Sequence, residues 1–183
     1  MKTLMLSGFC FLLGTQQLLS QEIGLTEELD ALARAPIQEA WQVTCNDELD
    51  RETCVASYNM FAEQSIDGET QRLGRVLLVG VLYGQSPGTS DSFLALSLNL
   101  PLGVDLQAGA VIRVDEEEEI QLPYLQCTQA GCGLSMPMDQ ELLTSLKMGR
   151  ELLVGFRAWG ASSLSILSVS LNGFTKAVSA LEE

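Results

Sequence analysis

Alternating leucines in the segment Phe93–Leu100 set the strongest limit on how this chain can fold. Leucine occupies every second position of the segment, and smaller or polar residues stand between the leucines. Because successive side chains of a strand point to opposite faces of a sheet, this period of two predicts a half-buried β-strand. A second segment, Arg75–Tyr83, is apolar at both alternating sets of positions. It predicts a strand in the middle of a sheet with cover on both faces.

Further segments of similar length have a β-forming composition and are separated by turn residues. They are Trp41–Cys45, Cys54–Met60, Ala110–Asp115, Ile120–Cys127, Glu151–Ala158 and Leu164–Leu171. About eight strands at this spacing predict a mostly β chain, folded as a β-sandwich or a distorted barrel. Two short peripheral helices are expected, one at Asp139–Met148 and one after Asn172-Gly173, because leucines or other apolar residues recur there at helical spacing.

The first twenty residues have the pattern of a secretory signal. Lys2 supplies a positive start, residues 4–13 are nearly all apolar, and a polar patch follows. We therefore expect a signal peptide over residues 1–20, a periplasmic or secreted location, and no transmembrane segment in the mature chain, since the apolar run is shorter than the roughly 20 residues that cross a bilayer. Residues 21–38 are expected to form an N-terminal arm with a short leucine-bearing helix capped by Thr26, and residues 39–183 one β domain.

Removal of the signal would discard Cys10 and leave Cys45, Cys54, Cys127 and Cys132. An even number of cysteines in an exported chain favours disulfides over free thiols. Of the three possible connectivities, local pairing is the simplest, with Cys45 joined to Cys54 and Cys127 joined to Cys132. Neither spacing is the C-x-x-C of common zinc and redox sites, so we expect neither a metal site nor a reactive dithiol.

The chain contains no histidine, which excludes Ser-His-Asp and Cys-His catalysis and histidine-ligated zinc. No glycine segment matches a phosphate-binding loop. We therefore expect no catalytic residues, no cofactor and no metal. Two carboxylates can cleave a glycosidic bond without histidine, and the 24 acidic residues leave a glycan hydrolase open as an alternative.

The formal net charge of −14 disfavours nucleic acid and anionic lipid as partners. A basic partner is compatible with this charge, although solubility alone also explains it. The acidic run Asp115–Glu119 cannot surround a calcium ion by itself, because consecutive strand residues point to opposite faces. We expect the run to be the solvated tip of a hairpin, with binding of a basic partner as the functional alternative. Trp41 and Trp159 could form a ligand surface, but packing in the core beside a strand explains each more simply.

Short motifs along the chain together resemble the invasion-associated locus B family. They are Trp41-x-Val43-x-Cys45, Leu98-x-Leu100-Pro101-Leu102-Gly103-Val104, Leu106-x-x-Gly109, Tyr124-x-x-Cys127-x-x-x-Gly131-Cys132 and Val169-Ser170-Leu171-x-Gly173-Phe174. Their order and spacing span residues 38–181. The run Glu116–Glu119 is not part of the family pattern.

Members of this family are exported proteins of Gram-negative bacteria, and the founding examples are linked to invasion of host red blood cells. The resemblance implies an envelope or secreted location, a β-rich fold and no recognised catalytic residues. Our leading hypothesis is an exported, non-enzymatic binding protein that acts on a protein or envelope component, in host-cell contact or in the envelope. An envelope assembly factor that pairs client strands with an exposed strand edge is the structural alternative.

Overall fold

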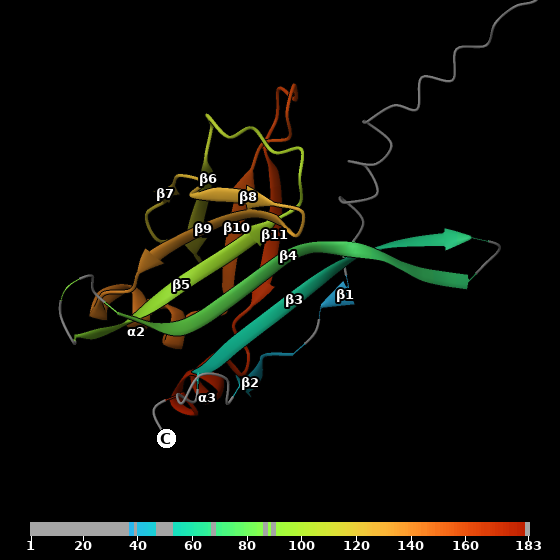
Figure 1. Ribbon diagram of the computed structural model, residues 1–183. Helices are drawn as coiled ribbons and strands as arrows, with labels where there is room; N and C mark the ends of the chain where they lie inside the picture. Colours follow the sequence, from blue (N-terminus) through green and yellow to red (C-terminus); the bar gives the residue numbers. More distant parts are fainter. Residues whose placement is uncertain are drawn as a thin grey trace, which may run out of the picture.

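The computed structural model describes residues 37–38, 40–46, 53–66, 69–85, 88 and 91–181. The expected signal peptide and most of the expected N-terminal arm, including Thr26, lie outside these residues. The described part forms two β-sheets packed face to face, with two short helices (Figure 1). The prediction of a mostly β chain is confirmed. Each sheet ends in edge strands, so the architecture is the sandwich and not a closed barrel.

The larger sheet contains seven strands in the order β1-β3-β4-β5-β9-β8, with β2 paired to β3. These strands are β1 (Ile37–Gln38), β2 (Gln42–Asn46), β3 (Thr53–Ile66), β4 (Glu69–Gln85), β5 (Ser92–Leu100), β8 (Gln126–Thr128) and β9 (Gly131–Pro137). The smaller sheet has four strands in the order β11-β10-β6-β7. These strands are β6 (Ala110–Val114), β7 (Ile120–Leu122), β10 (Glu151–Phe156) and β11 (Ser165–Ser170).

The core lies between the two sheets and contains the leucine face of β5. Leu96 and Leu98 are each 1% exposed and Leu100 is fully buried, as the alternation predicts. The fully buried side chains of Leu152 and Val154 on β10 belong to the same core cluster. Burial of each such side chain contributes roughly 1.5–3 kcal/mol to the hydrophobic stabilisation of the sandwich.

The strand β4 lies between β3 and β5, in the middle of its sheet as predicted. Its first face is buried, with Val79 and Val81 at 0% exposure. The expectation of full cover on the second face is wrong, because Leu78 and Leu82 on that face are only half-buried. The apolar residues of this second face are therefore partly open to solvent.

Both expected helices are confirmed. Helix α2 (Gln140–Met148) begins at Asp139, whose carboxylate accepts a hydrogen bond from the Leu142 amide at 2.8 Å. Helix α3 (Phe174–Ser179) follows Gly173, which has a φ of 90°. Phe174 and Val178 are fully buried, so α3 closes one end of the core with the apolar stripe that its spacing predicts.

The expectation of one strand over Ile120–Cys127 is wrong. The segment divides into β7 in the smaller sheet and β8 in the larger sheet. Pro123, which has no backbone N–H to donate, stands directly after β7. Strand β9 was not predicted, because its glycines and its final proline are residues that strands usually avoid. It pairs with β5 on one side and β8 on the other, and these neighbours stabilise it.

Strand β3 continues past Met60, its expected last residue, and β4 begins before Arg75, its expected first residue. They continue as a two-stranded hairpin that projects from the sandwich (Figure 1). We call this hairpin, residues Phe61–Ile66 and Glu69–Arg75, the β3–β4 extension. Its register shifts between Met60 and Phe61 and again between Phe61 and Glu63. Such irregularities bend and twist a strand pair, which explains why the extension leaves the plane of the sheet. Strand β1 pairs with β3 at its base.

Candidate functional site

Two loops meet at one end of the sandwich. They are the β5–β6 loop, Pro101–Gly109, and the β10–β11 loop, Arg157–Leu164, and we call them together the tip (Figure 1). Val104 and Ala158 form a β-bridge between the two loops. The Asp105 amide donates to the Arg157 carbonyl at 2.8 Å, and the Trp159 amide donates to the Gly103 carbonyl at 2.7 Å. These backbone bonds join two distant segments of the sequence into one unit.

An ion pair between Asp105 and Arg157 fixes the tip further. The Arg157 Nη2 atom lies 2.7 Å from Asp105 Oδ2, and Nε donates to the same oxygen at 3.1 Å. The other carboxylate oxygen accepts hydrogen bonds from the backbone amides of Gln107 at 3.0 Å and Ala108 at 3.3 Å. The hydrogen bonds from Arg157, and then those from the two amides, lower the pKa of Asp105. The pair is therefore neutral as a unit and holds both loops in place.

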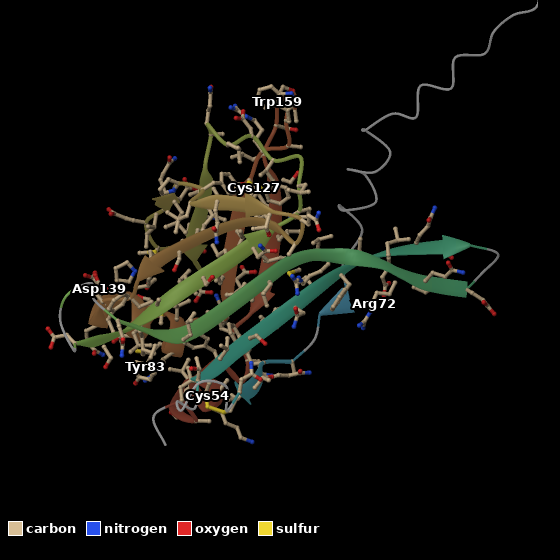
Figure 2. All side chains as sticks on the ribbon, viewed as in Figure 1. Cys54, Arg72, Tyr83, Cys127, Asp139 and Trp159 are labelled. Atoms are coloured by element: carbon tan, nitrogen blue, oxygen red, sulfur yellow. A yellow bond between two sulfur atoms is a disulfide. The ribbon has the colours of Figure 1, made fainter. Side chains whose placement is uncertain are left out.

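The tip carries apolar side chains that are open to solvent. The exposed fractions are 73% for Trp159, 59% for Leu102, 57% for Leu164 and 54% for Leu106. Asp105 and Arg157 are the only charged residues in the two loops. Figure 2 shows Trp159 at the outer end of the molecule. Exposed apolar side chains gathered on two adjoining loops are a candidate surface for binding another molecule.

The expectation that both tryptophans pack in the core is right for Trp41 and wrong for Trp159. Trp41 packs against Tyr58 and Phe174, with ring centroids 5.5 Å and 5.0 Å away, and its indole Nε1 donates to the Ser170 carbonyl at 2.9 Å. Trp159 instead stands on a turn. The residues after it, Gly160-Ala161-Ser162-Ser163, are turn formers, and they are the sequence signal that could have placed it outside the core.

Tyr124 lies near Asp105 of the tip, and in the sequence it stands out only as part of a family motif. Its hydroxyl is buried, and it has no hydrogen-bond partner among the described residues. Burial, and then the negative charge of Asp105, raise the pKa of Tyr124 to about 12. The phenol therefore stays protonated at neutral pH and cannot serve as a general base.

The acidic run is the turn of the β6–β7 hairpin, as predicted. Asp115 has a structural role, because its carboxylate accepts hydrogen bonds from the amides of Arg150 at 3.2 Å and Glu151 at 3.0 Å. Residues 116–119 are exposed, and Glu119 lies 3.7 Å from Arg113. Within the described residues, no group of three or more His, Cys, Asp or Glu side chains could hold a metal ion.

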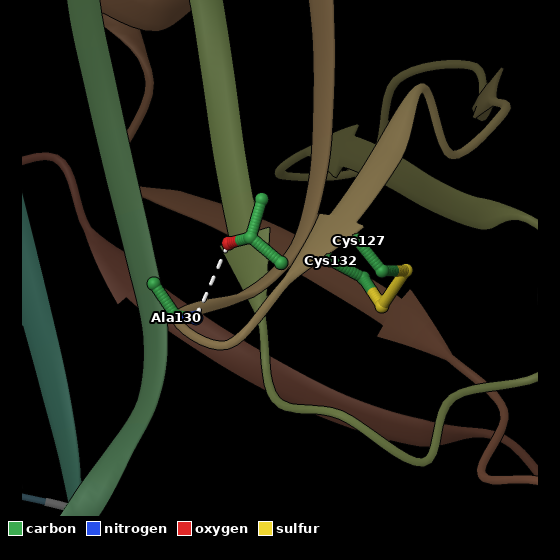
Figure 3. The surroundings of a disulfide bond; sticks show 4 residues. Cys127, Ala130 and Cys132 are labelled. Atoms are coloured by element: carbon green, nitrogen blue, oxygen red, sulfur yellow. Dashed lines mark hydrogen bonds between the residues drawn. A yellow bond between two sulfur atoms is a disulfide. The ribbon is translucent and has the colours of Figure 1, made fainter.

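The two disulfides of the structure each join directly opposite residues of neighbouring strands. Cys45 on β2 is bonded to Cys54 on β3. Cys127 on β8 is bonded to Cys132 on β9, beside a turn in which the Ala130 amide donates to Thr128 Oγ1 at 3.2 Å (Figure 3). Each bridge joins an outlying strand of the larger sheet, β2 or β8, to its neighbour.

We propose that both bridges form in the folded protein under oxidising conditions. Replacing Cys127 and Cys132 together with Ser should lower the free energy of unfolding by about 2 kcal/mol, because the open chain regains loop entropy when unfolded. Urea denaturation measures this change. Peptide mapping without reductant tests the pairing itself, and a bridge between Cys45 and Cys127, or four free thiols, would contradict it.

In the described part of the chain, no helix is long and apolar enough to span a bilayer. The model of the invasion associated locus B protein family matches residues 41–182. Two proteins called invasion protein B homologs, from Brucella abortus strain 2308 and from biovar 1 strain 9-941, are each 28% identical to this chain over 142 residues. The matched region covers 78% of this chain and 75% of each relative.

The fold also has a counterpart among solved structures. The crystal structure of invasion associated protein B from Bartonella henselae aligns with a TM-score of 0.58 and 21% sequence identity. The alignment covers 80% of this chain and 95% of that one. The family match over most of the sequence, together with the common fold, establishes the relationship that the short motifs indicate: the chain belongs to the invasion associated locus B family.

Proposed function

We propose that this protein is exported and binds a protein or envelope component through the tip, without catalysing a reaction. The observation that carries the proposal is the cluster of exposed apolar side chains on two loops that are fixed to one another. Loops at the end of a rigid β scaffold commonly carry binding function. The two disulfides support a location in an oxidising compartment. The relatives are named for invasion, and a role in host-cell contact or in the envelope is part of this proposal.

Several observations favour binding over catalysis. The family is not known as a family of enzymes, and the chain has no histidine. A glycan hydrolase needs a carboxyl group whose pKa is raised so that it can donate a proton. Asp105 at the tip has the opposite property, because Arg157 lowers its pKa. This carboxylate is suited to hold the loops and not to protonate a leaving group.

A strand-pairing assembly factor is the second candidate, and one observation favours it. Strand β4 pairs with β5 only from Leu78 onward. From Glu69 to Leu77, that side of β4 therefore has no paired strand within the described residues. A strand edge that is not covered by a neighbouring strand can accept an added strand from another chain.

Capture from envelope extracts, including membranes, tests the two candidates side by side. The tip variant combines Leu106→Ser with Trp159→Ser. The extension variant is Gln71→Pro, which places a residue without a backbone N–H opposite Gln64 in the paired part of the β3–β4 extension. We expect the tip variant to lose at least tenfold of the material captured by the unchanged protein, and the extension variant to retain it. Loss in the extension variant alone would support strand pairing. Equal capture by all three proteins would overturn both candidates.

A further inference from the structure

The chemistry of the tip narrows the choice of partner. Its exposed apolar side chains are a tryptophan and three leucines. Tryptophan is enriched where proteins meet the interface of a bilayer, because its ring is apolar and its indole N–H can bond to a polar group. Leucine is among the residues that enter hydrocarbon most readily. The exposed Gln107, Ser162 and Ser163 stand in the same two loops, where they can meet polar headgroups.

The charge of the tip also suits a lipid surface without net charge. The chain has a formal net charge of −14, yet the tip contains no charged group outside the Asp105–Arg157 pair. The pair is compensated at 2.7 Å, so the tip can approach an apolar medium without leaving an unpaired charge there. Unpaired charges are the groups that oppose insertion most strongly.

The acidic run lies at the far end of the smaller sheet from the tip. Strands β6 and β10 pair from Val114 and Leu152 at the acidic end to Ala110 and Phe156 at the tip end. At about 3.3 Å per residue, the four steps along these strands separate the two ends by about 13 Å. This distance exceeds the Debye length of about 8 Å at physiological ionic strength. A molecule that inserts the tip would therefore hold Glu116–Glu119 away from the membrane surface.

The shape of the tip favours a lipid surface over a protein groove. Energetically important contacts between proteins lie in packed pockets surrounded by a polar rim. Here the apolar side chains stand on projecting turns, with Trp159 at the outer end of the molecule (Figure 2). Leu164 directly precedes β11, and Ile166, the second residue of that strand, is 65% exposed. A fluid apolar medium can surround such separated side chains without a preformed pocket.

We propose that the tip inserts into the interfacial region of a bilayer with zwitterionic headgroups, through Leu102, Leu106, Trp159 and Leu164. This inference rests on the proposed function, because it names the envelope component that the tip contacts. The two loops are already fixed by the Val104–Ala158 bridge, so insertion requires little further ordering of the chain. The inserted depth is that of an interfacial anchor, about 5–10 Å, and not that of a spanning segment.

Flotation with phosphatidylcholine vesicles, together with tryptophan fluorescence, tests the inference on the protein produced with its own leader. The unchanged protein should float with the vesicles, and its emission should shift to the blue as Trp159 leaves water. The variant with Leu106→Ser and Trp159→Ser should bind at least tenfold more weakly. The matched control is Leu73→Ser, because Leu73 and Leu106 are both 54% exposed, and it should bind within twofold of the unchanged protein. Adding phosphatidylglycerol at low salt should weaken binding, because the whole molecule is acidic.

The outcomes separate this inference from the proposed function. Failure of the unchanged protein to float, or equal flotation of the tip variant, overturns lipid insertion. If the tip variant nevertheless loses capture of a protein from detergent-solubilised extracts, the tip binds protein and the proposed function stands. If the tip variant matches the unchanged protein in both assays, the inference and the proposed function both fail. Thermal unfolding of each variant checks that the sandwich is intact.

Discussion

Replacing Phe174 with Ala is expected to lower the free energy of unfolding by about 3–5 kcal/mol, the usual effect of removing a buried aromatic ring. Phe174 is the first residue of α3 and is fully buried. Its ring meets that of Trp41 edge to face, with centroids 5.0 Å apart. The substitution leaves a cavity beneath Trp41 and removes the main contact that seals this end of the core. Urea denaturation followed by circular dichroism measures the change.

Two further variants make this prediction specific. Phe174→Leu refills much of the cavity and should lower the free energy of unfolding by about 1–2 kcal/mol. Met148→Ala changes a side chain that is 81% exposed and should alter it by less than about 0.5 kcal/mol. The emission of Trp41 should move to the red only in the Phe174 variants. A loss below 1 kcal/mol for Phe174→Ala would contradict the position of α3 on the core.

Elements whose pattern is local could be predicted from the sequence. The leucine alternation of β5 and the helical spacing after Gly173 each record which face of one element is buried. Asp139 caps α2 because its side chain bonds an amide three residues on, which is also a local relation. For these elements, the residues that determine the structure lie within the element or next to it in the sequence.

Elements that depend on distant neighbours could not be predicted in the same way. Strand β9 has an unfavourable composition and exists because β5 and β8 pair with it. The β3–β4 extension is polar, and its strands are longer than the apolar pattern that located them. In both cases the stabilising partner lies elsewhere in the chain, and tertiary pairing outweighs intrinsic propensity.

The tip, like these elements, depends on contacts between distant parts of the chain, and its assembly could not be predicted from a local pattern. Large apolar residues are usually buried, so the core was the reasonable expectation for Trp159. The turn formers after Trp159 are a local signal of its exposure, but the bridge between Val104 and Ala158 that fixes its loop joins distant segments. In the sequence, Leu100-Pro101-Leu102-Gly103 stands out only as part of a family motif. In the folded chain that segment presents Leu102 at 59% exposure and joins the candidate binding surface.

Replacing Gly131 with Ala is the second change expected to destabilise the chain strongly, by about 3 kcal/mol. Gly131 begins β9 with a φ of 127°, a backbone conformation that side-chain-bearing residues rarely adopt and that costs about 1–3 kcal/mol by itself. A β-carbon there would also collide with the carbonyl oxygen of Leu100 and lie 2.6 Å from Asn99 Oδ1. Relief of that collision must displace β9 from β5, since the obstructing atoms belong to the neighbouring strand.

The same strand supplies a matched control two residues away. The nearest atom to a β-carbon at Gly133 is the Gln126 carbonyl oxygen, at an ordinary contact distance of 3.8 Å. Gly133→Ala should therefore leave the free energy of unfolding unchanged or raise it by up to about 1 kcal/mol, because alanine loses less backbone entropy on folding than glycine. Denaturation of both variants in urea, with the Cys127–Cys132 bridge intact, gives the comparison. Equal stability of the two variants would contradict the close approach of Gly131 to Leu100 and Asn99. It would also contradict the pairing of β9 with β5.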